Sequence, residues 1–331
     1  MRELAYERAT DPASAVALVS GHEDARFLAG GTNLLDHLKL GITEPGLLVD
    51  VSRLPLDAVE EYDDHLLVGT NARNSDVAVH PRVRTAFPVL SQALLAGASP
   101  QIRNQATTGG NLLQRTRCVY FQDRTTPCNK REPGTGCSAQ EGYGRHNAVL
   151  GTSEHCVAVH PSDMAVALAA LDAGVVVLGP AGERRVPIGE LHRLPGDRPD
   201  RDTTLEHGEL ITGVEVPWLP DGARSSYHKA RDRASYAFAL ASVAAVLRLD
   251  GDRVQEVRLA WGGVAHRPWR ARRAEQQLAG SRLDEAAVRA AVAVELEGAT
   301  IGRQNAYKTR LVEQVSWLAL RDLAGLPGGG R

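Results

Sequence analysis

All four cysteines of this 331-residue chain lie in one polar segment, between residues 118 and 156. Their spacing is C-x9-C-x8-C-x18-C, and the segment contains five glycines and no sustained hydrophobic periodicity. An irregular segment of this length is usually either functional or disordered. A metal centre that cross-links the cysteines would hold such a segment in one conformation, so we expect an ordered insertion in an otherwise regular fold.

The residue types alone are compatible with three kinds of cysteine site. Thiolates are soft ligands, and four of them complete the coordination shell of one [4Fe–4S] cluster, whose potential nearby backbone N–H groups would tune. Structural zinc sites normally contain short C-x-x-C pairs, which this segment lacks. Two disulfides would require an oxidising compartment. The pattern therefore favours the cluster over structural zinc, and over disulfides or free thiols.

The composition is that of a globular protein with two domains. The chain is longer than one typical domain, and 43% apolar residues are enough for sizeable cores. A formal net charge of −2 gives no electrostatic reason to expect binding to nucleic acid or to an anionic membrane. The N-terminus lacks the apolar core of a signal peptide, and no apolar run reaches the length of a membrane span. We therefore expect a soluble chain with no export signal of its own.

Hydrophobic periodicity and turn residues predict a mixture of helices and strands. Residues 102–114 are expected to form a loop, and a change in composition at LPDGARSS favours a domain boundary at 219–226. Helices are expected within residues 13–22, 32–41, 87–97, 161–174, 270–279, 284–298 and 305–324. Residues 65–80 are expected to pass from a strand through a polar turn into a helix. Further strands are expected within residues 25–31, 46–54, 175–188, 209–218 and 242–264, the last as a hairpin around Asp-Gly.

Two glycine pairs occur in a setting that suits contact with a ligand. The segments LAGGTNLLD (28–36) and TTGGN (107–111) both place Asn and then apolar residues after Gly-Gly. Glycine lets the backbone approach a ligand, and N–H groups at a helix start can bind a pyrophosphate. Neither segment is a G-x-G-x-x-G or Walker A motif. Each pair alone favours an ordinary tight turn, and the recurrence adds only a little weight to a ligand site.

The sequence contains no constellation for nucleophilic or acid–base catalysis. It has no G-x-S-x-G, no H-E-x-x-H and no carboxylate pair at an informative spacing. Cofactor-like loops without proton-transfer residues indicate electron transfer, so no catalytic residue is expected on this chain.

The chain resembles the FAD-binding medium subunit of the xanthine dehydrogenase family of molybdenum hydroxylases. The resemblance runs from about residue 3 to residue 325 and rests on LAGGTNLLDHLKLG, IRNQATTGGN, HPSDMAVALAALDA, GELITGVEVP and YHKARDRASYAFALASVAAVLRL, in that order. Most members pass almost directly from the second glycine loop to the Ser-Asp helix, whereas the cysteine segment intervenes here. That departure resembles the cluster-bearing branch, above all the FAD/[4Fe–4S] subunit of periplasmic aldehyde oxidoreductase. The medium subunit of 4-hydroxybenzoyl-CoA reductase is a less close match.

The resemblance implies an α+β protein whose FAD-binding fold is of the PCMH (vanillyl-alcohol oxidase-like) type, with two subdomains. The FAD-binding domain would span residues 1–220 and would carry the [4Fe–4S]-bearing insertion at about 115–158. A smaller α+β C-terminal domain would span residues 221–331.

The resemblance also implies a set of FAD contacts. The second glycine loop would contact FAD through Thr107, with Gly110 and Asn111 adjacent. The first loop would hold the FAD pyrophosphate through Leu28, Ala29, Gly30, Gly31, Thr32, Asn33, Leu34, Leu35 and Asp36, with Gly30 to Asn33 closest.

Three further residues would act on the flavin. Asp163 would hydrogen-bond the cofactor, Ile211 would pack near the flavin ring, and Lys229 would favour negative charge on the reduced ring. Without the resemblance they are typical of a helix first turn, a core residue and an exposed lysine. The ligands of the [4Fe–4S] cluster would be Cys118, Cys128, Cys137 and Cys156.

The implied function is that of an electron-transfer subunit in a molybdenum-dependent aldehyde oxidoreductase. Aldehyde oxidation would occur on a large molybdopterin-binding partner, and electrons would pass through [2Fe–2S] clusters on a small partner to FAD and then to an external acceptor. Two alternatives stay open: a 4-hydroxybenzoyl-CoA reductase-like enzyme, and a non-redox module with structural zinc. The cytoplasm is the expected compartment, unless a partner's twin-arginine signal exports the assembled complex.

Overall fold

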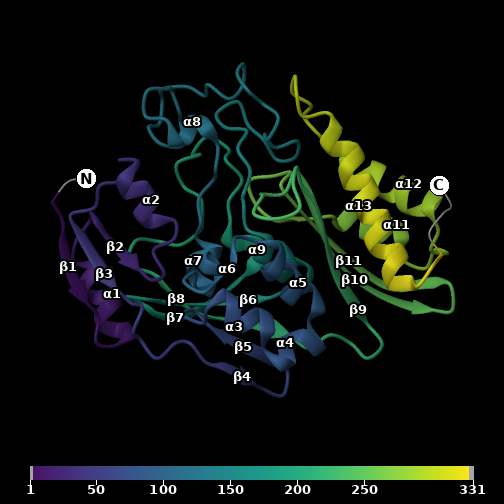
Figure 1. The fold of residues 1–331 in the computed structure, drawn as a ribbon, viewed down its shortest axis with the longest axis horizontal. Helices are drawn as coiled ribbons and strands as arrows, with labels where there is room; N and C mark the ends of the chain where they lie inside the picture. The colour runs from purple at the N-terminus through teal and green to yellow at the C-terminus, as the bar shows by residue number, and fades with distance from the viewer. Residues whose placement is uncertain (1–2, 328–331) are drawn as a thin grey trace.

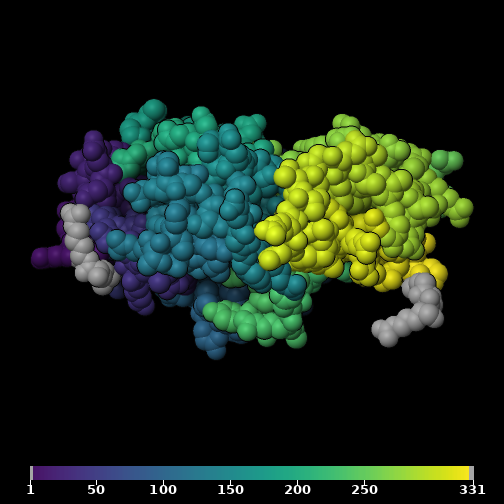
Figure 2. Space-filling view, turned by 90° about the horizontal axis from the view of Figure 1, so that it is seen from above, coloured from purple at the N-terminus to yellow at the C-terminus, as the bar shows by residue number. Residues whose placement is uncertain are grey.

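Three β-sheets follow one another along residues 3–327, the part of the chain that the computed structural model describes (Figure 1). The mixture of helices and sheets confirms the expected α+β class. Figure 2 shows the N-terminal and C-terminal parts at opposite ends of the molecule, with the middle of the chain between them.

The N-terminal unit is a small parallel sheet with two helices. Its elements are β1 (Ala5–Arg8), α1 (Pro12–Ser20), β2 (Ala25–Leu28), α2 (Leu34–Lys39) and β3 (Leu47–Asp50). The strand order is β1-β3-β2, and β3 is buried along its whole length because it pairs on both sides. Helix α1 begins after a capping box formed by Asp11 and Ser14, with Pro12 in its first turn.

The central unit is an antiparallel sheet covered by helices. Its strands are β4 (Val59–Glu61), β5 (His65–Gly69), β6 (Gly174–Gly179), β7 (Gly182–Pro187) and β8 (Leu210–Pro217), in the order β4-β5-β8-β6-β7. Its helices are α3 (Asn74–Val79), α4 (Pro81–Ala86), α5 (Pro88–Ala96), α6 (Pro100–Arg103), α7 (Thr108–Leu112), α8 (Val119–Gln122), α9 (Asp163–Ala170) and α10 (Ile188–Leu191).

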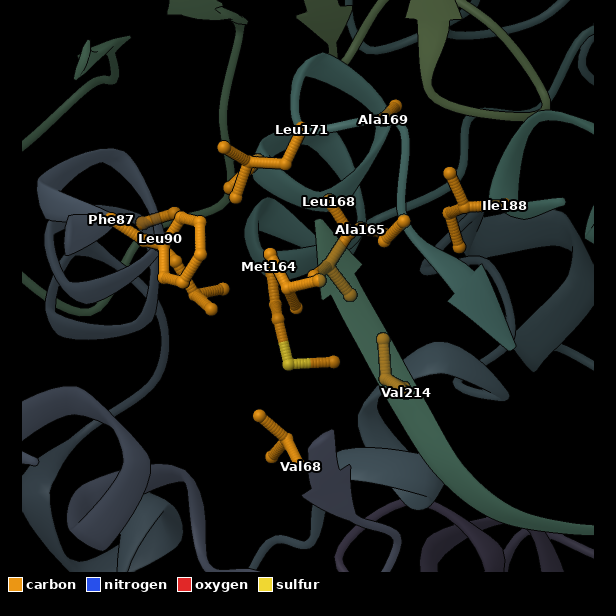
Figure 3. Packing of buried hydrophobic residues seen from close by; sticks show 14 of the residues in the cluster. Val68, Phe87, Leu90, Met164, Ala165, Leu168, Ala169, Leu171, Ile188 and Val214 are labelled. Atoms are coloured by element: carbon orange, nitrogen blue, oxygen red, sulfur yellow. The ribbon is translucent and has the colours of Figure 1, made fainter. Parts of the chain in front are cut away.

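Helix α9 is the centre of this core. Every residue of the helix is buried, as its apolar composition on all sides requires. Figure 3 shows Met164 and Leu168 between Leu90 of α5 and Val214 of β8. Ser162 caps the helix by accepting a hydrogen bond from the Ala165 N–H at 3.0 Å. The first turn of α9 is therefore held at a defined place, where it contributes to the site described below.

The C-terminal unit is an antiparallel sheet with three helices. Its elements are β9 (Arg224–Ala230), β10 (Ala241–Asp250), β11 (Arg253–Gly262), β12 (Trp269–Arg270), α11 (Arg272–Leu278), α12 (Glu285–Leu296) and α13 (Tyr307–Ala324). Alternate residues of β10 face different cores. Ala244 and Val246 join the core around α9, whereas Val243, Ala245 and Leu247 join the core beneath the C-terminal helices. The third sheet is therefore packed on both faces.

Most of the expected elements are confirmed, and the structure differs from the expectations at several places. The predicted loop 102–114 contains α7 and the end of α6, because Ser99 and Thr107 each cap a helical turn. Helix α9 lies within the expected range 161–174 but ends at Ala170, Asp172 takes a left-handed conformation, and Gly174 begins β6. Strand β9 was not foreseen, because its polar sequence alternates too weakly. None of the helices within residues 3–327 is both long and apolar enough to cross a membrane.

The end of the cysteine segment is held by the C-terminal unit. Three side chains at the start of α13 bind consecutive parts of its backbone. The Asn305 amide donates to the Ala148 carbonyl at 2.9 Å, the Tyr307 hydroxyl donates to the Arg145 carbonyl at 2.8 Å, and the Lys308 ammonium donates to the His146 carbonyl at 3.1 Å.

Lys308 should make stability depend on pH. Burial lowers the pKa of Lys308 from its usual 10.5 to about 7. Between these values the unfolded chain binds more protons at this site, so the free energy of unfolding should rise with pH by up to ~1.4 kcal/mol per pH unit. Denaturant titrations of Lys308→Met across this range should lack that rise. The same change at exposed Lys39 is the control, and an unchanged slope in Lys308→Met would contradict the prediction.

Candidate functional site

A cleft with a volume of about 700 Å³ is lined by residues of the N-terminal, central and C-terminal units. This volume is in the range of about 300–1,000 Å³ that is usual for cofactor pockets. The structure brings seven of the predicted FAD contacts to its wall: Thr32, Asn33, Asp36, Gly110, Asn111, Asp163 and Lys229. These residues come from four separate stretches of the sequence, so only the tertiary structure joins them.

The two glycine loops lie directly against each other. The Gln105 amide donates to the Gly30 carbonyl at 3.2 Å, and a Cβ on Gly30 would stand only 2.3 Å from the Gln105 carbonyl oxygen. Gly31 has φ +73°, in the left-handed region that suits glycine. Gly30 and Gly31 therefore set the backbone path of the first loop without lining the cleft themselves, whereas Thr32 and Asn33 line it.

Thr107 stabilises the second loop by capping a helix and does not line the cleft. Its hydroxyl oxygen caps α7 by accepting a hydrogen bond from the Gly110 N–H at 3.3 Å, and its side chain is buried. Five of the remaining predicted contacts, Leu28, Ala29, Leu34, Leu35 and Ile211, do not line the cleft. Ile211 lies in the core of the central sheet, 2% exposed. FAD contact by these residues stays a prediction.

A buried ion pair closes one side of the cleft. The Lys229 ammonium lies 2.7 Å from one carboxylate oxygen of Asp163, and the Tyr227 hydroxyl donates to the other at 2.5 Å. Burial and the Asp163 charge hold the pKa of Tyr227 well above its ordinary value, so this hydroxyl keeps its proton. Because Asp163 balances Lys229, the pair adds little net charge. A carboxylate accepts about four hydrogen bonds, so Asp163 can still accept one from a ligand.

Several residues that line the cleft were not foreseen. Arg103 and Arg117 supply positive charge, and Gly262 and Gly263 form a third glycine pair, on the C-terminal unit. The pair is visible in the sequence as AWGGV, but it was assigned to the expected hairpin of residues 242–264 and not to a ligand site. Residues 232–239 form the rest of the C-terminal wall, and sequence patterning gave no indication of that.

The cleft fits a flavin dinucleotide on the chemistry of its lining. Glycine backbone and the two arginines suit a pyrophosphate, which is anionic. The Asn74 Oδ1 and His160 Nε2 atoms are buried at its wall without a hydrogen-bond partner, and buried polar atoms of this kind normally have one. A polar ligand in the cleft would supply it.

The four cysteines line one small, almost wholly apolar cavity beside the cleft. All four are free thiols; Cys128 and Cys156 are buried, and Cys118 and Cys137 are half-buried. No group of three or more His, Cys, Asp and Glu side chains within residues 3–327 is placed to hold a single metal ion. Four thiols around one cavity match the number of ligands in the coordination shell of a [4Fe–4S] cluster.

The surroundings of the thiols act on their pKa values in two opposite directions. Burial raises the pKa of Cys156 to about 12, and burial likewise raises the pKa of Cys118 and Cys137. Hydrogen bonds from backbone N–H groups act against this effect of burial and lower the pKa of each of the three thiols. The charge of Lys130 also lowers the pKa of Cys156. Such N–H groups are typical around iron–sulfur ligands. Metal binding would release the thiol protons.

Asn129 organises the loop that carries two of the cysteines. Its side-chain oxygen accepts hydrogen bonds from the Gly134 and Gly136 N–H groups at 3.1 and 2.8 Å, and its amide donates to the His155 carbonyl at 3.1 Å. Both glycines have positive φ, which permits this tight path. One polar side chain next to Cys128 thus joins the segments that hold Cys137 and Cys156.

The cysteine cavity and the cleft share a wall. Cys118 and Ala158 line both spaces. The first glycine loop also contacts the start of the cysteine segment, because the Arg115 N–H donates to Asn33 Oδ1 at 2.9 Å. The two candidate cofactor sites are therefore neighbours.

Fold and site together define a flavoprotein with an FAD-binding domain. Residues 2–219 match the family described as "FAD binding domain in molybdopterin dehydrogenase", and residues 225–322 match "CO dehydrogenase flavoprotein C-terminal domain". The chain belongs to the family of FAD-binding medium subunits of molybdenum hydroxylases, which are oxidoreductases.

Individual relatives agree with this assignment. The chain is 52% identical to the aldehyde oxidoreductase FAD-binding subunit PaoB of Escherichia coli K12, over 84% of this chain and 86% of that protein. It is 28% identical to the glyceraldehyde dehydrogenase medium chain of Sulfolobus acidocaldarius, over 86% of this chain and 83% of that one. The structure of carbon monoxide dehydrogenase from Hydrogenophaga pseudoflava matches with a TM-score of 0.76 and 27% identity, covering 98% of both chains.

Proposed function

We propose that the chain is the FAD- and [4Fe–4S]-binding electron-transfer subunit of a molybdenum-dependent aldehyde oxidoreductase. The convergence of all four cysteines on one cavity beside the FAD cleft carries this proposal. The aldehyde specificity is supported by the 52% identity to a subunit named for that activity.

Each group contributes a defined chemistry when bound. FAD exchanges electrons singly or in pairs, and an iron–sulfur cluster exchanges them singly. The chain's own residues bind and position these groups. Gly110 and Asn111 line the cleft for FAD, Asp163 offers an acceptor at its wall, and the cysteine thiols surround the cluster cavity. Cys118 lines both spaces.

The partners and the compartment are part of the same proposal. Electrons would arrive from a small [2Fe–2S] subunit, and aldehyde oxidation would occur on a large molybdopterin-binding subunit. The acceptor would be a small molecule or a protein. We retain the cytoplasm as the compartment, or the periplasm if a partner carries a twin-arginine signal. The division into domains 1–220 and 221–331 is supported by the family matches, which meet between residues 219 and 225.

Iron and flavin analysis of the purified chain tests the proposal. We expect one FAD and four irons per chain, with absorption by both chromophores. Replacing all four cysteines with serine should remove the iron and leave FAD bound, because the cleft is lined mainly by other residues. One FAD without iron would refute the cluster, and a colourless chain with zinc would favour the structural-zinc alternative.

The role of the cluster as a relay needs a second measurement. In the assembled complex, the serine variant should lose electron transfer from aldehyde to the external acceptor while the molybdenum site still turns over one substrate. Unchanged steady-state turnover with lowered stability would show that the cluster only holds the loop. Reduction of an aromatic acyl-CoA by the complex would favour the 4-hydroxybenzoyl-CoA reductase-like alternative.

A further inference from the structure

A buried cation lies at the wall of the cysteine cavity. Lys130, two residues after Cys128, lines this cavity, and its side chain is 2% exposed. Its ammonium donates to the Pro199 carbonyl at 2.7 Å and to Asp202 Oδ1 at 2.5 Å. Lysine is almost never buried to this extent without a partner. Burial of the Lys130 ammonium costs desolvation free energy, and the attraction to Asp202 offsets it.

The charges around Lys130 do not cancel. Asp202 also pairs with Arg115, whose Nε lies 2.5 Å from the other carboxylate oxygen. Two cations thus share one carboxylate, which leaves one net positive charge. The Arg115 guanidinium stacks over Phe121 at 4.7 Å from the ring centroid, and Phe121 also lines the cavity. The excess positive charge accordingly sits beside the space that the thiols surround.

A buried imidazole lies nearby. The His266 Nε2 atom is 3.3 Å from the Cys156 sulfur, and His266 is buried. Net charge and hydrogen bonds to sulfur are two of the factors that set the potential of an iron–sulfur cluster. Reduction adds one negative charge to the cluster, and a buried positive charge stabilises that state more strongly than an exposed one.

We infer that Lys130 is a positioning residue for electron transfer that raises the reduction potential of the cluster, with Asp202 limiting the effect. The inference rests on the proposed function, because it needs a cluster in the cavity. It concerns the fixed charge of Lys130 and requires no change in its protonation.

Redox titration of the cluster in the full chain, followed by electron paramagnetic resonance, tests the inference. In Lys130→Met the equilibrium constant for one-electron reduction should fall about tenfold, equivalent to a shift of ~59 mV to lower potential. Asp202→Asn should shift the potential in the opposite direction, because it removes the balancing negative charge. Lys130→Arg should stay close to the wild type. Lys39→Met removes an exposed cation from α2 and should leave the potential unchanged.

The opposite signs separate an electrostatic role from a structural one. If Lys130 only anchors the loop, Lys130→Met and Asp202→Asn should both lower the iron content, and neither should move the potential in the predicted direction. That result, or unchanged potentials in chains that hold their iron, would overturn the inference alone. A wild-type chain that binds FAD but no iron would instead refute the proposed cluster, and the inference with it.

Discussion

Replacing Asp163 with alanine is expected to lower the free energy of unfolding by about 3–5 kcal/mol, because it leaves the Lys229 ammonium buried without a counter-charge. Both side chains of this pair are less than a tenth exposed, at 3% for Lys229 and 8% for Asp163. The Tyr227 hydroxyl would also lose its acceptor. Urea unfolding of the FAD-free chain measures the effect on folding, and flavin content of the purified chain measures the effect on binding.

A double variant provides the control for this prediction. Asp163→Asn alone should be destabilising, since Lys229 keeps its charge, whereas Asp163→Asn combined with Lys229→Met removes both charges and should recover most of the loss. If the double variant did not recover stability, the loss in free energy of unfolding would come from packing around α9 and not from the unpaired charge. A stability of Asp163→Ala within about 1 kcal/mol of the wild type would show that the pair is not buried in solution.

Replacing Gly30 with alanine is expected to abolish FAD retention. The new Cβ would stand 2.3 Å from the Gln105 carbonyl oxygen, so the two glycine loops must move apart. Backbone shifts of this kind cost about 1–3 kcal/mol in stability. They also displace Thr32 and Asn33 from the cleft wall, which should weaken FAD binding more than folding.

Gly189 is a matched control for Gly30. It lies in a helix, and a Cβ there would meet no heavy atom within 4 Å. Gly189→Ala should therefore keep full flavin content and equal or slightly higher stability. Flavin absorption per chain after gel filtration compares the two variants. Full retention of FAD by Gly30→Ala would show that the contact between the loops does not shape the FAD site.

Local sequence determined the elements whose signals are short-ranged. A helix was expected within residues 161–174, and α9 lies there with Ser162 as its N-cap. The Asp-Gly turn predicted the hairpin of β10 and β11, and the two strands pair antiparallel, with a register shift between Arg248 and Leu249. The polar strand β9 and the caps within residues 102–114 were missed, because strand pairing and side-chain capping depend on neighbours that a local pattern does not contain.

The candidate site could be predicted in part. The glycine pairs and the clustered cysteines identified the chain segments that form the site. The resemblance to the family assigned Asp163 and Lys229 to the surroundings of the flavin. Neither source showed that these two residues pair with each other, which changes the expected effect of Lys229 from a free positive charge to a balanced one. The position of Arg117 and of residues 232–239 at the cleft was not visible either, since these residues lie far apart in the sequence and only the tertiary structure brings them to one wall.

The sequence by itself determined which chemical groups are present. It has four soft thiols in one segment, backbone freedom at glycine pairs, and no catalytic acid, base or nucleophile in a recognisable motif. What only the tertiary structure decided is proximity. It places four thiols around one cavity, puts that cavity against the cleft, and buries Lys130 beside it. Electrostatic and redox properties depend on distance and burial, and residues far apart in sequence acquire both only when their elements pack together.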